Sequence, residues 1–225
     1  MKKIIWSFWE GPKTDLMQKS YNSWKKYCSD WEINLVDLSS IKKYHIEKPK
    51  NFEVLTPTKK SDFIRLNLLY NYGGLWMDAT IILHENLDWF LKKMKDYPYF
   101  GFIYSKDKCH IENWMIAVKN KHDYCIGEWL KYFIQLLNNA NHKPGYFDNY
   151  KAYCDLNQNN PKFKKIHNSI PFIKKKPGYN FLWPRTKGLT KFTSGWRKAY
   201  PYINFPLIYL YMIIIIVIVT VLYVF

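Results

Sequence analysis

The hydrophobic positions near the N-terminus change from strand-like to helical spacing and back. Residues 2–6 form a short apolar run and residues 33–36 alternate between apolar and polar side chains, so both segments are predicted to be strands. Between them, apolar side chains recur at helical spacing, which predicts an amphipathic helix over residues 15–28. A strand, a helix and a second strand in this order indicate the beginning of an α/β sheet.

The pattern continues through the middle of the chain. Thr56 followed by Pro57 is typical of a helix start, and Gly73 with Gly74 is typical of a helix end, so a helix is predicted between them. Further strands are predicted at residues 75–77, 80–83, 99–104 and 114–118, and further helices at residues 124–137 and 161–166. Residues 174–200 are rich in Pro, Gly and Lys and are predicted to be largely loop.

The C-terminal segment differs in composition from the rest of the chain. No charged residue occurs between positions 203 and 225, and a helix over residues 207–225 would span close to the ~30 Å of a bilayer core. Arg197 and Lys198 precede it, and basic residues favour the cytoplasmic side. We therefore predict a cytoplasmic domain at residues 1–200 and a single-pass transmembrane tail at residues 203–225. A buried β-hairpin is the alternative, because Ile and Val prefer strands.

Composition narrows the classes of function. The 225 residues include 34 Lys and Arg against 18 Asp and Glu, a net charge of +16 that suits nucleic acid, an anionic membrane surface or a phosphorylated small molecule. The basic residues are mostly lysines spread along the chain, without a nucleic-acid-binding motif, so nucleic acid is not predicted as a partner. The aromatic content of 19% excludes a wholly disordered chain. The four cysteines form no CxxC pair and are expected to be reduced thiols.

Candidate chemistry is concentrated between residues 59 and 80. Asp62 and Arg65 are three residues apart on a predicted helix and so share a face, while Asp78 ends the strand that follows. Ligands of open α/β sheets bind at the carboxyl ends of strands, where an Asp can bind a divalent cation and an Arg can bind phosphate. The alternative is a surface ion pair worth about 0–1 kcal/mol, with Asp78 merely ending a strand.

Three segments resemble a known family. The N-terminal KKIIWSFWEGP, the central SDFIRLNLLYNYGGLWMDAT and the later GYFDNYKAYCDLNQNNPKFKKIHNSIPFI are similar to the capsular polysaccharide synthesis glycosyltransferases. These are relatives of the family 32 glycosyltransferases and, more distantly, of the glucosylating bacterial toxins. The resemblance covers roughly residues 2–173 and implies an α/β, GT-A-like nucleotide-sugar-binding sheet flanked by helices. It also implies retaining transfer of a sugar from a nucleotide-diphosphate donor, a UDP-sugar first of all, to a polysaccharide or lipid-linked glycan.

The resemblance also assigns donor-binding residues. It places Ile5, Trp6 and Ser7 around the nucleotide base, and stacking of Trp6 on uracil is physically reasonable because a base presents an apolar face to an aromatic ring. It assigns Asp62 and Arg65 to the sugar and phosphates of the donor.

The metal and acceptor assignments follow from the same resemblance. Asp78 is the first position of an Asp-x-Asp motif for Mn²⁺ or Mg²⁺, and Thr80 occupies the second position as a candidate ligand through its neutral hydroxyl. The replacement removes one carboxylate and predicts weaker metal binding. Asn113 and Asp148 are acceptor-side candidates. A non-catalytic domain that binds nucleotide sugars or carbohydrate is the alternative to an enzyme.

Overall fold

The computed structural model describes residues 1–104, 109–139, 145–175, 185–186 and 188–191. Its elements alternate between strands and helices over most of this length, as the hydrophobic pattern predicts. In chain order they are β1 (Ile4–Phe8), α1 (Asp15–Tyr27), β2 (Glu32–Val36), η1 (Ile41–Tyr44), η2 (Phe52–Val54), α2 (Pro57–Tyr72), β3 (Gly74–Met77), β4 (Ile81–Leu83), α3 (Asp88–Met94), β5 (Tyr99–Tyr104), β6 (Ile111–Val118), α4 (Tyr124–Asn138), α5 (Asp148–Asn159), α6 (Pro161–Ser169), β7 (Ile173–Lys175), β8 (Arg185–Thr186) and β9 (Leu189–Lys191).

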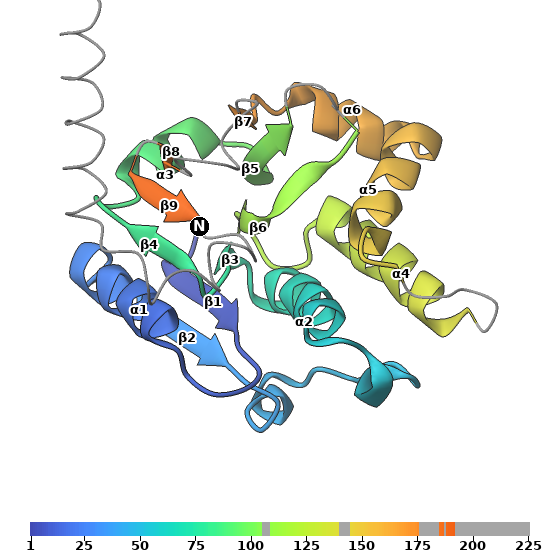
Figure 1. Ribbon diagram of the computed structural model, residues 1–225. Coiled ribbons are helices and arrows are strands. Elements are labelled where there is room, and N and C mark those ends of the chain that lie inside the picture. The colour runs from blue at the N-terminus through green and yellow to red at the C-terminus, as the bar shows by residue number, and fades with distance from the viewer. Residues whose placement is uncertain (105–108, 140–144, 176–184, 187, 192–225) are drawn as a thin grey trace, which may run out of the picture.

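The main sheet is mixed and six-stranded, in the order β2-β1-β3-β6-β5-β7. β1 pairs in parallel with both β2 and β3, whereas β6 pairs antiparallel with β3 and β5. Figure 1 shows α4, α5 and α6 on one side of the molecule and α1 on the other, with α2 beside β3. The predicted α/β sheet flanked by helices is therefore confirmed, and β3 lies at its centre.

The junction of α2 and β3 explains how the central strand is positioned. The Thr56 side chain caps α2 by accepting from the backbone N–H of Lys59, and Pro57 occupies the first turn. Gly73 ends the helix at a φ of +67°, and Gly74 follows at +92°. A side chain on Gly74 would bring its Cβ to 2.8 Å from the carbonyl oxygen of Ile4, so only glycine lets β3 pair with β1 here.

The segment between residues 174 and 200 is not simply loop, and that prediction was wrong where the structure describes it. β7 adds to the edge of the main sheet, and β4, β9 and β8 form a second, three-stranded sheet. In this sheet β9 pairs antiparallel with β4, placing Lys191 opposite Ile81. These strands were missed because they are short and are held by partners distant in sequence rather than by a local pattern.

The helix α5 was also absent from the sequence prediction. Its first residue is preceded by Phe147, which provides no side-chain cap, and its buried face includes the polar residues Asp148, Asn149 and Asn157. A helix of this kind lacks a start signal, and polar residues interrupt the apolar stripe formed by Ala152, Tyr153 and Leu156. It packs between α4 and α6 and contacts β6.

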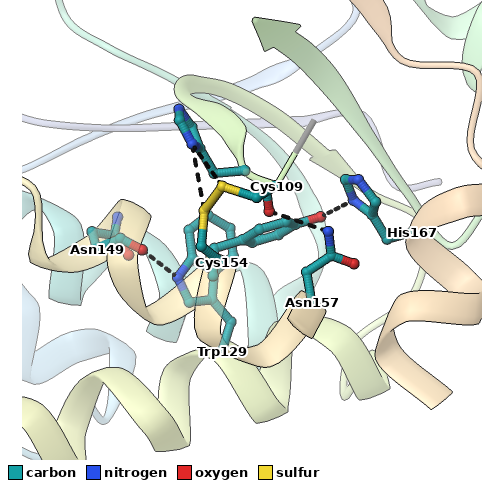
Figure 2. Close-up of a disulfide and its surroundings, with 8 residues drawn as sticks. Cys109, Trp129, Asn149, Cys154, Asn157 and His167 are labelled. Carbon is teal, nitrogen blue, oxygen red and sulfur yellow. Dashed lines mark hydrogen bonds between the residues drawn. A yellow bond between two sulfur atoms is a disulfide. The ribbon is translucent and has the colours of Figure 1, made fainter. Parts of the chain in front are cut away.

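A disulfide joins the segment just before β6 to α5 (Figure 2). It links Cys109 and Cys154, whose Cα atoms are 4.8 Å apart, so the expectation of reduced thiols was wrong for these two residues. Cys28 and Cys125 are buried thiols. The pairing could not be derived from sequence, because the two partners are 45 residues apart and meet only through the packing of α5.

We expect the disulfide to stabilise the fold by constraining the unfolded chain. Replacing both Cys109 and Cys154 by serine should lower the free energy of unfolding by roughly 2–4 kcal/mol, as is typical of loops of this length. Urea denaturation of the two proteins without reductant measures the difference. Addition of a dithiol reductant should lower the midpoint of the native chain alone, and equal midpoints for both proteins without reductant would contradict the prediction.

The predicted transmembrane tail at residues 203–225 lies outside the described residues. Within the part of the chain that the structure describes, none of the helices combines the length and hydrophobicity needed to cross a bilayer.

Candidate active site

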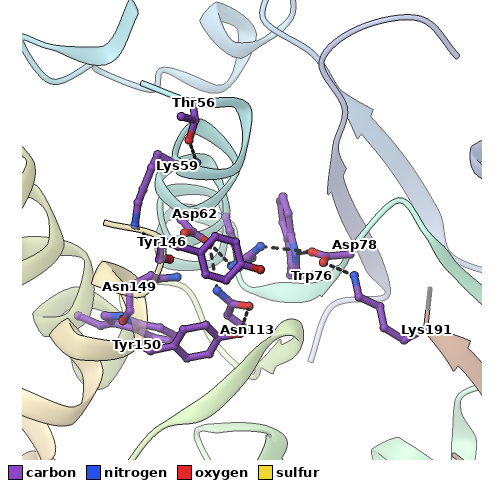
Figure 3. Close-up of polar contacts among 12 residues, drawn as sticks. Thr56, Lys59, Asp62, Trp76, Asp78, Asn113, Tyr146, Asn149, Tyr150 and Lys191 are labelled. Atoms are coloured by element: carbon purple, nitrogen blue, oxygen red, sulfur yellow. Dashed lines mark hydrogen bonds and ion pairs between the residues drawn. The ribbon is translucent and has the colours of Figure 1, made fainter. Parts of the chain in front are cut away.

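Arg65 contacts two carboxylates at the point where β3 ends, those of Asp62 and Asp78, which Figure 3 labels. Arg65 Nη1 donates to Asp62 Oδ1 at 2.7 Å, and Nη2 donates to Asp78 Oδ1 at 3.2 Å. The guanidinium carbon lies 4.8 Å from the centre of the Trp76 ring, whose Nε1 donates to the same Asp78 oxygen at 2.9 Å. The three residues selected from the sequence therefore meet in one place, with the guanidinium held by two ion pairs and an aromatic face.

Burial separates this cluster from the ordinary surface ion pair considered above. The side chains of Asp62 and Arg65 are only 3% and 4% exposed. Burial raises the pKa of Asp62 above its usual value, and the nearby charges of Arg65 and Lys59 act against that rise. A buried ion pair is weak evidence for stability, whereas buried groups with shifted pKa values cluster at functional sites, so this pair is a candidate for function.

Asp78 lies at the edge of the cluster, with a side chain that is 26% exposed. Its second oxygen accepts from Lys191 Nζ of β9, which also lies 3.4 Å from Thr80 Oγ1. Burial would raise the pKa of Asp78, but the charges of Lys191 and Arg65 outweigh it and hold the pKa below its usual value. Asp78 is therefore ionised at neutral pH and contacts two cationic groups.

The two acceptor-side candidates occupy different positions relative to Asp62. Asn113 lies beside it, since its Nδ2 donates to Asp62 Oδ1 at 3.0 Å and its Oδ1 accepts from Tyr150 at 2.9 Å. Asp148 is 3.4 Å from the buried ammonium of Lys59 and accepts from the Gly145 backbone N–H at 2.8 Å. Asn113 thus belongs to the cluster directly, whereas Asp148 contacts Lys59 and fixes the turn before α5.

The residues predicted to bind the nucleotide base lie in the strand β1 next to β3. Ile5, Trp6 and Ser7 are 0%, 2% and 0% exposed. The Trp6 ring packs against Tyr44 and Tyr72 and donates from Nε1 to the Gly73 carbonyl at 2.9 Å, so a base could reach it only if these neighbours move. The buried hydroxyl of Ser7 has no hydrogen-bond partner among the described residues. Base binding by these three residues stays a prediction.

The groups at Asp78 do not form a divalent-cation site as they stand. Asp78 is the single carboxylate of the predicted motif, and its oxygens accept from Trp76, Arg65 and Lys191. Magnesium and manganese prefer several oxygen ligands and no adjacent cations. Among the described residues, the one cluster of His, Cys, Asp or Glu with suitable spacing for a metal is Cys109, His110 and Cys154, where the two cysteines form the disulfide.

Sequence reasoning missed four residues of this site. Lys59 precedes Asp62 by three positions on α2, and Trp76 precedes Asp78 by two on β3, so the helical and strand periods could have indicated both. Tyr150 and Lys191 gave no local signal. They reach the site through α5 and β9, two elements that the hydrophobic pattern did not predict.

The fold and the site together define an α/β protein similar to glycosyltransferases. The structure matches one titled PaToxG Glycosyltransferase with a TM-score of 0.52 and 15% identity, over 75% of this chain and 73% of that one. At this identity the match is evidence for the fold alone. The family profile of the capsular polysaccharide synthesis proteins matches residues 1–181, so the chain belongs to that family. The resemblance inferred from the three sequence segments is thereby confirmed.

Curated relatives are glycosyltransferases. The chain is 28% identical over 167 residues to a probable glycosyltransferase, FCK3, of Fusarium pseudograminearum, and 27% identical over 160 residues to the glycosyltransferase afumC of Aspergillus fumigatus. The matches cover 65% and 60% of this chain but only 42% and 41% of those proteins. The chain thus spans about two fifths of the length of the relatives it matches.

Proposed function

We propose that this chain is a retaining glycosyltransferase that uses a nucleotide-diphosphate sugar, a UDP-sugar first of all. The acceptor would be a polysaccharide or a lipid-linked glycan of a capsule or another surface polysaccharide. Family membership and the two glycosyltransferase relatives support the transferase class. The proposed tail at residues 203–225 would hold the catalytic domain at the cytoplasmic face of a membrane, close to a lipid-linked acceptor.

The observation that carries the proposal is the fixed guanidinium between Asp62 and Asp78 at the end of β3. Ligands of α/β sheets bind at this end of the strands, and a planar guanidinium is well suited to a diphosphate. Asp62 would orient the donor sugar through hydrogen bonds to its hydroxyl groups.

Transfer would proceed by attack on the face from which the diphosphate leaves. The bond between the anomeric carbon and the phosphate oxygen breaks, and the electron pair stays on the diphosphate. The acceptor oxygen bonds to the same face and its proton passes to the departing phosphate, so the configuration is retained. Arg65 would stabilise the charge that develops on the leaving group, which is electrostatic stabilisation of the transition state.

Exposed aromatic rings beside the cluster favour a carbohydrate acceptor. Tyr146 and Phe147 are each 68% exposed, and the Phe147 ring is 6.2 Å from that of Tyr150, which donates to Asn113. Exposed apolar surface of this kind next to a polar site is typical of a ligand-binding surface. Asn113 would bind an acceptor hydroxyl, and Asp148 would hold the turn that presents the two rings.

The test is a panel of nucleotide sugars assayed for hydrolysis and for transfer to glycan acceptors, in parallel with Mn²⁺ and with EDTA. Release of nucleoside diphosphate from at least one donor is the expected result. Binding of a nucleoside diphosphate without turnover of any donor would instead support the non-catalytic binding domain, which Thr80 in the second motif position favours.

A further inference from the structure

The ammonium of Lys191 lies where the predicted motif would hold a metal ion. Its Nζ contacts Asp78 Oδ2 and is 3.4 Å from Thr80 Oγ1, so it lies between the two motif positions. An Asp at both positions would offer a divalent cation two carboxylate ligands. Here one position carries a neutral hydroxyl, and a built-in cation contacts both side chains.

Strand pairing, rather than the reach of a mobile surface lysine, places this ammonium. β9 pairs with β4 so that Lys191 is opposite Ile81, the residue after Thr80. Leu189 anchors β9 with a fully buried side chain, and the Trp24 Nε1 donates to the Ile81 carbonyl at 2.7 Å on the partner strand. The Lys191 side chain is not fully buried in this position, since 19% of it remains exposed.

The charges of the cluster are consistent with a lysine and not with an added divalent cation. The ionised Asp78 already contacts two cationic groups, Arg65 and Lys191, before any metal ion is added. Two further positive charges beside Lys191 would be repelled at contact distance. With an Asp at position 80 and no lysine, the same place would carry excess negative charge and favour a metal. Thr80 and Lys191 thus act in the same direction, since the first removes a carboxylate and the second adds a cation.

We propose that Lys191 is a catalytic residue that replaces the divalent cation, contacts the diphosphate of the donor and makes sugar transfer independent of metal. This inference rests on the proposed function, because it assumes a nucleotide-diphosphate donor. As the bond to the anomeric carbon breaks and its electron pair moves to the phosphate oxygen, the ammonium stabilises the new charge together with Arg65.

The test is calorimetric titration with UDP in EDTA or Mn²⁺, which does not depend on turnover. The native chain should bind UDP with the same affinity, within about twofold, in both conditions. Lys191→Gln should lower the affinity about tenfold in EDTA, because it removes a charge-assisted contact to phosphate. Lys119→Gln is the matched control, since Lys119 forms a surface pair with the fully exposed Asp96 and should leave binding unchanged.

A double variant tests the arrangement in the opposite direction. Thr80→Asp combined with Lys191→Gln should bind UDP at least about tenfold more tightly with Mn²⁺ than with EDTA, because it restores two carboxylates and removes the competing ammonium. Thermal unfolding of each variant establishes that it is folded.

Three results would overturn the inference. They are a tenfold or larger loss of UDP affinity of the native chain in EDTA, equal affinities of the Lys191 and Lys119 variants, and no metal-free binding of UDP. Metal-free binding that depends on Lys191, with no turnover of any nucleotide sugar, would instead refute the proposed transferase and leave the cation assignment in place.

Discussion

Replacement of Arg65 by methionine is expected to lower sugar transfer, measured as kcat/KM, by about 10³-fold. Mutations that remove one preorganised donor to a developing negative charge commonly cost 10²–10³-fold, and Arg65 also joins Asp62 to Asp78. Methionine keeps the apolar stem of the side chain, so the change removes mainly charge and donors. Initial rates with the donor identified by the panel provide the measurement.

The same substitution should also lower stability, and the two effects need to be separated. Removing one partner of a buried ion pair typically costs about 3–5 kcal/mol, because the other group, here Asp62, stays buried and loses its ion-pair partner. Denaturant unfolding gives this value, and rates are then compared only where both proteins are folded. Arg65→Lys is the matched variant, because it keeps the charge but loses the planar guanidinium. Its kcat/KM should lie between that of the native chain and that of the methionine variant. Activity of the methionine variant within tenfold of native would refute a role for Arg65 in stabilising the leaving group.

Asp78→Asn is expected to lower kcat/KM by about 10²-fold while the fold stays intact. Asparagine still accepts a hydrogen bond from Trp76, but it carries no charge to hold Arg65 and Lys191 in position. Because Asp78 is 26% exposed, the loss of stability should be about 1 kcal/mol or less. Asp96→Asn is the control, since Asp96 forms a lysine pair on the surface and should change neither rate nor stability. Native-like rates in the Asp78 variant would contradict the assignment.

The pH dependence of Asp78 follows from the direction of its pKa shift. The charges of Lys191 and Arg65 overcome the effect of burial and lower the pKa of Asp78, so its ionised form is favoured by folding. The stability it contributes is therefore fully present above the unfolded pKa of about 3.9, and is lost as pH falls through the lower folded value. The decrease in the free energy of unfolding over this acidic range, measured by denaturant unfolding, should be smaller in Asp78→Asn than in the native chain.

The predictions that the structure confirms are those that depend on neighbours in sequence. The cap at Thr56 and Pro57 and the glycines at 73 and 74 set both ends of α2, and Asp78 then follows the last residue of the central strand β3. Each of these features depends on hydrogen bonds or sterics within a few residues, which is why spacing alone revealed them.

The predictions that failed concerned contacts between distant segments. Residues 174–200 contain strands where loop was expected, and Cys109 is bonded to Cys154 where thiols were expected. α5 buries the polar side chains of Asp148, Asn149 and Asn157, so the hydrophobic pattern of its sequence does not indicate a buried helix face.

The sequence by itself determined the α/β order of elements, the family and the short-range placement of Asp62, Arg65 and Asp78, because helical and strand periods fix which residues share a face. Only the tertiary structure decided which charges meet Asp78. Lys191 is 113 residues away and reaches it because β9 pairs with β4, and no local pattern encodes such a pairing. The contact between the Lys191 ammonium and Asp78 therefore exists only in the folded chain.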